Sequence, residues 1–176
     1  MLLFRERGYH DTSLTDLGVA MRLTPGSIYK AFKDKREIFI AVFERYVQHR
    51  HLALETALQA HQTGRAKLRA ALTFLAETSH GAEGRMGCLV VGSTTDLTTF
   101  DPEMASMVAQ ASQRMEKRFR DLIKLGQADG SLVRALDPTV TANTLLCLTQ
   151  GFRVAGKSGR TRAEMTATVE QIVSFL

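Results

Sequence analysis

The chain has few cysteines and no long apolar run. Cys88 and Cys147 are its only two cysteines, and they lie far apart without the CxxC or zinc-type spacing of a disulfide framework or a metal site. No apolar run approaches the roughly 20 residues that cross a bilayer, and the opening MLLFRERG is charged too early for a secretory signal. We therefore expect reduced thiols, no metal, no cofactor, no membrane segment and a cytoplasmic location.

Familiar catalytic signatures are absent too. The sequence contains no GxSxG, P-loop, dinucleotide-binding glycine fingerprint or HExxH, which are the patterns that position a nucleophile, a phosphate group or a zinc ion. The histidines do not gather either, since His49 and His51 stand two apart and would point to nearly opposite sides of a helix. An enzyme is therefore not expected.

Composition indicates a folded protein, whereas the net charge does not decide whether it binds nucleic acid. Of the 176 residues, 44% are hydrophobic and 23% are charged, as in ordinary globular domains. The formal net charge is +5 and the pI is about 9.5. This balance suits a polyanion such as nucleic acid, but it also occurs in proteins that bind none.

Hydrophobic periodicity predicts an all-α fold. Apolar residues recur three and four apart through every long segment, which is typical of helices rather than strands. We expect a loop at about 79–87 and helices over about 1–7, 13–21, 24–32, 34–60, 64–78, 88–97, 101–125, 138–156 and 162–176. The first pattern begins without a capping residue, so we expect that helix to be truncated at its start.

The expected helices change in length along the chain. The first three are short, whereas the fourth is long and continues to about residue 60. We interpret this change as a boundary between two domains, a small N-terminal module over residues 1–47 and a larger helical domain over residues 48–176.

Two of the short helices form a helix-turn-helix pattern. Ser13 with Asp16 predicts a capping box at the start of the first, and Thr24 followed by Pro25 predicts the start of the second after a tight turn. In such a unit the second helix enters the major groove of DNA. Helix capping alone remains the alternative role for Ser13 and Thr24.

The residue types around the second helix fit that role. Small residues at its start would let the backbone and the hydroxyl groups approach base edges: Thr24, Pro25, Gly26 and Ser27. Its flank adds groups that suit phosphate oxygens: Tyr29, Lys30, Lys33 and Lys35. A half-buried tyrosine and a solvated lysine face remain the alternatives.

Several short motifs follow one another here: Leu3-Phe4, Gly8-Tyr9, Thr12-Ser13, Gly26-Ser27-Ile28-Tyr29, Phe32 and Lys35. Over about residues 1–48 the chain thereby resembles the N-terminal DNA-binding domain of TetR-family transcriptional regulators. The resemblance implies major-groove contacts by Thr15, Thr24, Pro25, Gly26 and Ser27, and phosphate contacts by Ser13, Tyr29 and Lys35. Two positions depart from the family pattern, because Arg22 stands at the usual turn glycine and Ala31 at an often aromatic position.

The resemblance also implies an effector pocket in the larger domain. The candidate lining residues are Phe74, Thr78, Cys88, Val91, Met115, Phe119, Thr149 and Phe152. Each is also an ordinary type of core residue. Together they predict a mainly apolar pocket with a few hydroxyl groups, and hence a hydrophobic or aromatic small molecule. Cys88 is either a reactive thiolate at a loop-to-helix junction or a buried inert thiol.

A dimer is expected, because a module that reads only a few base pairs binds paired half-sites on DNA. The last two expected helices carry apolar stripes with small residues that permit close helix contact: Ala142, Gly151, Ala155, Gly156, Ala163 and Ala167. The resemblance likewise places a four-helix dimer interface there. Packing of these stripes on the protein's own core is the alternative.

The sequence thus predicts a homodimeric regulator of double-stranded operator DNA, and more specifically a repressor released by a small hydrophobic or reactive effector. The alternative is a helical small-molecule-binding or interaction protein that no longer binds DNA. Salt-dependent DNA binding separates the two, because phosphate contacts release counterions.

Overall fold

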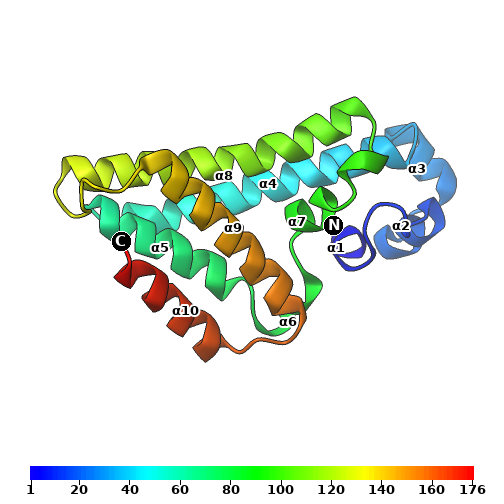
Figure 1. Ribbon diagram of the computed structural model, residues 1–176. Helices are drawn as coiled ribbons and strands as arrows, with labels where there is room; N and C mark the ends of the chain where they lie inside the picture. The colour runs from blue at the N-terminus through cyan, green and yellow to red at the C-terminus, as the bar shows by residue number, and fades with distance from the viewer.

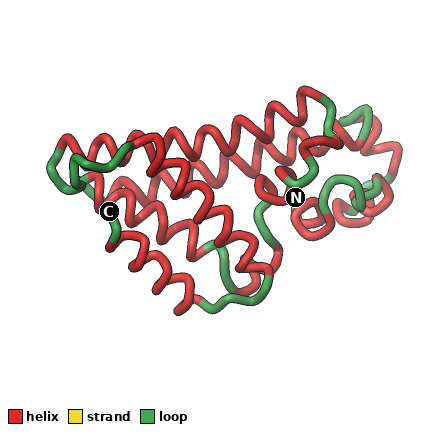
Figure 2. Tube along the Cα trace, in the orientation of Figure 1, coloured by secondary structure: helices red, strands yellow, loops and turns green.

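The computed structural model describes residues 1–176 and contains ten α-helices, one short 3-10 helix and no strand. Figures 1 and 2 show the arrangement of the helices and the loops between them. The all-α prediction is confirmed. The elements are α1 (Leu2–Arg7), α2 (Leu14–Met21), α3 (Pro25–Ala31), α4 (Lys35–Gln59), α5 (Gly64–Glu77), α6 (Gly81–Met86), α7 (Leu89–Thr94), η1 (Leu97–Thr99), α8 (Pro102–Ala128), α9 (Pro138–Lys157) and α10 (Arg162–Ser174).

The first three helices lie at one end of the molecule (Figure 1), and their starts follow local signals. Ser13 caps α2, because its Oγ accepts a hydrogen bond from the Asp16 N–H at 3.1 Å and its own N–H donates to the Asp16 carboxylate at 2.9 Å. Thr24 caps α3, and Pro25 occupies the first helical position. A backbone N–H at this position makes no hydrogen bond within the helix, so proline, which lacks one, loses nothing there. The predicted helix-turn-helix start signals are thus confirmed.

The two long helices α4 and α8 run side by side through the molecule (Figure 1). Near their starts, Arg36 Nε donates to the Asp101 carboxylate at 2.7 Å. Further along, Arg118 pairs with Glu55. The first ion pair joins the starts of the two helices, and the second joins positions further toward their ends, so α4 and α8 run in the same direction. They form the frame on which the other helices pack.

Two apolar cores are built on this frame. One joins α1–α4 to α7 and the start of α8, and Phe4, Ile28 and Phe39 belong to it. The other joins the end of α4 to α5, α8, α9 and α10. α4 supplies Phe43 to the first core and Leu54 to the second, and it continues unbroken across residue 48. The domain division between residues 47 and 48 therefore stays a prediction.

The expected loop at residues 79–87 contains a helix instead, α6, which ends at Gly87 in a positive-φ conformation. The glycines in this stretch indicated a loop by their chain flexibility. However, Gly84 packs so closely on Ser79 that an added Cβ would lie 2.6 Å from the Ser79 carbonyl carbon. Gly84 therefore lies in a helix because close packing requires a residue without a side chain there, and not because the chain is flexible. None of the helices has both the length and the apolar composition that crossing a membrane requires.

Candidate nucleic-acid interface and internal cavity

The start of α3 is an open surface. Within α3 only Ile28 is buried, at 3% exposure, and Thr24, Pro25, Gly26 and Ser27 are all exposed. A Cβ added to Gly26 would meet nothing within 4 Å. The backbone here is therefore bare enough for another molecule to approach it.

Polar groups surround this surface. Ser13, Thr15, Tyr29 and Lys30 are exposed, with Tyr29 at 58%, so the half-buried alternative for this tyrosine does not hold. The predicted residues are thus accessible to another molecule on α2 and α3. Hydroxyl, amide and ammonium groups in such an arrangement can donate hydrogen bonds to phosphate oxygens.

Lys35 differs from the other predicted phosphate contacts, since it is half-buried. Its Nζ donates to the Tyr9 carbonyl at 2.8 Å and lies 4.3 Å from the centre of the Tyr9 ring. The ammonium group therefore holds the loop after α1 against the start of α4. Its phosphate contact stays a prediction.

One residue of the turn between α2 and α3 and one residue within α2 shape this interface. Arg22, which stands at the usual turn glycine, adopts the left-handed conformation, with φ 55° and ψ 41°, so it bears the backbone strain that a glycine would avoid. Gly18, which sequence reasoning missed, lies at the crossing of the two helices. A Cβ added there would lie 3.2 Å from the Leu23 carbonyl oxygen and 3.4 Å from the Ile28 side chain. A glycine inside an otherwise helical pattern was the available signal.

A cavity of about 150 Å³ lies among α4, α5, α7, α8 and α9. The structure brings five of the eight predicted pocket residues into its lining: Phe74, Cys88, Val91, Met115 and Thr149. The other three lie outside the lining: Thr78, Phe119 and Phe152. Phe119 and Phe152 are core residues at 0% and 5% exposure. The sequence could not exclude them from the pocket, because a helical pattern alone does not separate a core face from a cavity face.

The lining is apolar in its majority, but it is more basic than the sequence predicted. Arg50, Arg114, Arg118, Arg153 and His51 take part in it, and no aspartate or glutamate does. Sequence reasoning missed the arginines, because long side chains can lay their aliphatic stems along an apolar surface and direct their charged ends elsewhere. The spacing of residues 114 and 118, four apart on one helix, was the available signal.

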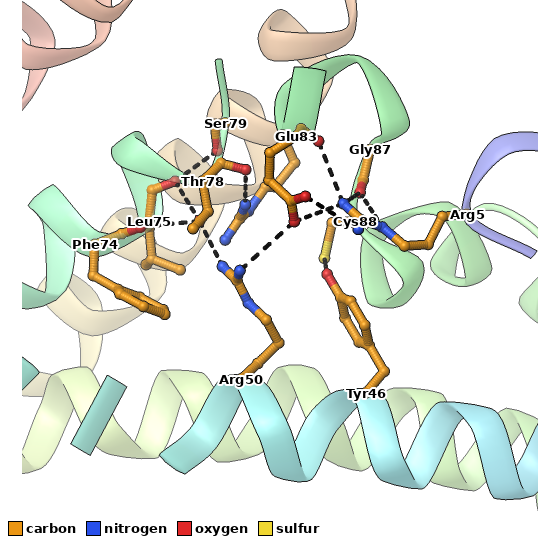
Figure 3. A network of polar contacts seen from close by, with 11 residues as sticks. Arg5, Tyr46, Arg50, Phe74, Leu75, Thr78, Ser79, Glu83, Gly87 and Cys88 are labelled. Atoms are coloured by element: carbon orange, nitrogen blue, oxygen red, sulfur yellow. Dashed lines mark hydrogen bonds and ion pairs between the residues drawn. The ribbon is translucent and has the colours of Figure 1, made fainter. Parts of the chain in front are cut away.

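A polar network joins this cavity to the first helix (Figure 3). Arg5 of α1 is 9% exposed; its Nε and Nη2 donate to the Gly87 carbonyl at 2.9 and 2.6 Å. The same Nη2 lies 2.8 Å from Glu83 Oε1. Arg50, which rises from α4 in Figure 3, places Nη1 3.9 Å from that oxygen. One carboxylate therefore stands between α1 and the cavity.

Cys88 lies in the lining beside Tyr46, whose hydroxyl donates to Sγ at 3.5 Å. Burial raises the pKa of the Cys88 thiol, but the charge of Arg153 and hydrogen bonds from the Val91 and Val90 N–H groups and the Tyr46 hydroxyl outweigh it, so the pKa lies below its usual value. Burial and the neighbouring Cys88 raise the pKa of Tyr46 to about 12. The tyrosine therefore keeps its proton and donates a hydrogen bond to the sulfur.

Family models match both parts of the chain. Residues 1–42 match the model of bacterial regulatory proteins of the tetR family. Residues 64–172 match the model of the tetracyclin repressor-like C-terminal domain.

Individual relatives agree with this. The chain is 25% identical over 160 residues to the HTH-type transcriptional repressor ComR of Escherichia coli (strain K12), a match that covers 90% of this chain and 76% of ComR. It is 25% identical over 161 residues to the HTH-type transcriptional repressor DhaR of Mycobacterium sp. (strain GP1), covering 91% and 79%.

Among solved structures, the chain is similar to a cysteine-substituted form of the TetR family transcriptional regulator CifR in complex with a 26-bp double-strand operator DNA. The identity is 25%, the TM-score is 0.84, and the match covers 98% of this chain and 90% of CifR. The two family models, the helix-turn-helix geometry and this likeness agree over nearly the whole length. The chain belongs to the TetR family of transcriptional regulators, which are DNA-binding proteins and not enzymes.

Proposed function

We propose that this chain is an effector-responsive repressor. Two copies form a homodimer in the cytoplasm, and α3 of each copy docks in the major groove of one operator half-site. A small molecule that fills the cavity among α4, α5, α7, α8 and α9 releases the DNA. The names of ComR and DhaR as repressors support this sign of regulation.

The observation that carries the proposal is the bare surface at the start of α3. Thr24, Pro25, Gly26 and Ser27 are all exposed, and a Cβ added to Gly26 would meet nothing within 4 Å. Close approach of the backbone to base edges needs such a surface. Tyr29, Lys30 and the strained Arg22 flank it and supply groups for phosphate contacts.

An unpaired apolar stripe on α9 supports the dimer. Val140, Leu148 and Val154 are 64%, 42% and 61% exposed, and Gly151 lies on the same exposed side. Helix α10 exposes Ala163 and Ala167, and Phe175 is exposed just after it. The other predicted small residues differ, because Ala142 and Gly156 are buried within the chain and Ala155 is half-buried against its core. A second copy can cover these exposed residues as a four-helix contact.

The network around Glu83 supports coupling between effector and DNA. Glu83 contacts Arg5 of α1 and approaches Arg50 of the cavity lining. An effector that moves Arg50 or Glu83 changes the hold on α1, against which the helix-turn-helix core packs through Phe4. The effector then releases DNA if it binds the loosened arrangement better than the DNA-bound one.

DNA binding can be tested on the full chain with a labelled fragment from upstream of its own gene, by fluorescence anisotropy over a series of salt concentrations. We expect the logarithm of the affinity to fall linearly with the logarithm of the salt concentration. Lys30→Ala should reduce that slope by about 2 per dimer, because each copy loses one phosphate contact.

Lys124→Ala is the matched control, since Lys124 is exposed on α8 and makes no ion pair. It should leave the slope unchanged. A chain that binds no such fragment even at low salt would instead favour the alternative, a helical ligand-binding or interaction protein that does not bind DNA.

A further inference from the structure

The charges in the cavity are unbalanced. Four guanidinium groups line it, from Arg50, Arg114, Arg118 and Arg153, and no carboxylate does. Just outside the lining, Glu55 pairs with Arg118, and Glu83 is shared by Arg50 and Arg5. No acidic group lies within ion-pair distance of the remaining two arginines. The cavity therefore carries positive charge that the protein does not neutralise.

Arg153 is the clearest case. It is 7% exposed, and its one hydrogen bond runs from Nη1 to the Thr78 carbonyl at 2.6 Å. Its other N–H groups have no protein acceptor. Because a buried charge without a counter-ion is costly, this guanidinium is favourable only if an anion or water satisfies it. Its positive charge also favours the ionised form of the adjacent Cys88 thiol.

Two like charges meet at one residue. Arg50 Nη2 donates to Thr78 Oγ1 at 2.5 Å, while Arg153 donates to the carbonyl of the same threonine. Repulsion between them opposes this arrangement, and Glu83, which lies 3.9 Å from Arg50 and also acts on Arg153, offsets only part of it. In the same lining, the buried Oγ of Ser112 has no hydrogen-bond partner. The cavity thus holds cationic donors and an unsatisfied hydroxyl group next to apolar walls.

We infer that the cavity binds a small organic acid, whose carboxylate interacts with Arg153 and Arg50 and whose apolar body packs against Phe74, Leu54 and Leu146. This inference rests on the proposed function, because it names the chemical class of the effector. A planar carboxylate matches the paired N–H groups of a guanidinium. It would supply the missing negative charge at the point where the two arginines converge.

The size of the cavity limits the acid. A volume of about 150 Å³ is close to that of a protein cavity that holds one benzene ring. A benzoate-like or short-chain aliphatic acid therefore fits this volume. The hydrophobic or aromatic body that the sequence predicted is kept, and a negative charge is added to it.

The charge of the cavity differs from that of its surroundings. Val47, His51 and Arg114 line both this cavity and a more open groove between α4 and α8. Glu44 and Glu103 line the groove but not the cavity. Arg114 is exposed and forms no ion pair, so positive charge prevails in the cavity rather than along the groove, and an anion is attracted to the cavity.

The test compares acids with uncharged molecules of the same shape. Benzoate and pentanoate, with benzamide and pentanamide as controls, are titrated into the full chain by calorimetry at neutral pH. At least one acid should bind saturably and raise the unfolding temperature, and its amide should bind at least tenfold more weakly because it lacks the charge-assisted hydrogen bonds.

Variants locate the charge. Arg153→Met keeps the length and apolar stem of the side chain and should weaken acid binding at least tenfold while leaving amide binding unchanged. Arg114→Met changes an exposed side chain and keeps the test informative if the first variant does not fold; it should weaken the acid by a smaller factor. Arg120→Met removes a positive charge from the same helix outside the lining and should have no effect.

Amides that bind as tightly as the acids, or the binding of neither acid, would overturn the inference. An acid that binds equally well to wild type and Arg153→Met would do the same. Failure of the proposed function looks different, since the acid would then bind as described while the operator fragment is not bound, or is bound and not released.

Discussion

At the scale of single residues, Arg22 determines the turn that orients α3. It is the one non-glycine residue with a positive φ, and this conformation costs roughly 1–2 kcal/mol for a residue with a side chain. Its N–H still donates to the Val19 carbonyl at 3.2 Å, so the end of α2 is satisfied. The turn therefore keeps the geometry of a glycine turn and adds an exposed cation beside α3.

Asp101 is the residue whose charge state ties α8 to α4. Hydrogen bonding from Arg36, supported by the Met104 and Glu103 N–H groups, lowers the pKa of Asp101 to about 2, below the value of about 3.9 for an unfolded chain. The stabilisation is therefore present at neutral pH and is lost as the pH falls from about 4 toward about 2. We predict that Asp101→Asn lowers the urea midpoint at neutral pH and that this difference from wild type shrinks across that acid range.

Asp137→Asn is the control for this prediction. Asp137 caps α9 as Asp101 caps α8, and it accepts hydrogen bonds from the Thr139 and Val140 N–H groups at 2.8 and 3.0 Å. No arginine pairs with it. Because asparagine also caps helices well, this variant should lose less stability at neutral pH. Equal losses in the two variants would show that the Arg36 pair contributes nothing.

At the scale of elements, α9 serves two surfaces at once. One side exposes Val140, Leu148 and Val154, which we assign to the dimer. The opposite side presses on the connection between α5 and α6, where Gly156 meets Ser79. This close approach places Arg153 beside Thr78 and so forms one wall of the cavity.

Gly156→Ala tests this helix contact. An added Cβ would lie 2.0 Å from the Ser79 carbonyl oxygen, so α9 or the connection must shift. We predict a loss of about 1–3 kcal/mol in the free energy of unfolding, measured by urea denaturation. The matched change is Gly92→Ala in α7, where an added Cβ meets nothing within 4 Å; it should be neutral or stabilising by about 0.5–1 kcal/mol. Equal effects would contradict the close contact.

At the scale of the whole molecule, the parallel pair of α4 and α8 joins the DNA-binding end to the cavity and the proposed dimer face. Both helices carry core residues for both ends. In the proposed mechanism, a change at the cavity reaches α1 through Glu83, and the proposed contact between α9 helices sets the spacing of the two copies of α3.

Leu148→Glu tests the dimer face. Leu148 is 42% exposed on α9, and a carboxylate opposite its own copy would repel it and be desolvated. We predict a monomer in analytical ultracentrifugation and a loss of operator affinity of roughly a hundredfold or more, because the two half-sites are no longer bound together. Val133→Glu, 57% exposed between α8 and α9, should stay dimeric. A Leu148→Glu dimer with full affinity would exclude this interface.

Much of the local structure could be predicted from the sequence because it depends on neighbouring residues. The capping box of Ser13 and Asp16 and the Thr24-Pro25 start act over three residues, so chain order alone reveals them. The same holds for the exposed start of α3, where small residues stand next to one another. Periodicity also indicated which helices carry an apolar stripe.

The cavity chemistry could not be predicted in this way, because it depends on contacts between distant residues. Arg5 and Gly87 are 82 positions apart, and Arg153 and Thr78 are 75 apart. Periodicity identifies the side of a helix that is covered, but it does not name the element that covers it. The sequence by itself determined most of the helices, their caps and the exposed start of α3. Only the tertiary structure decided that α6 is a helix and that four arginines converge on one cavity, since packing between distant helices sets where long charged side chains end.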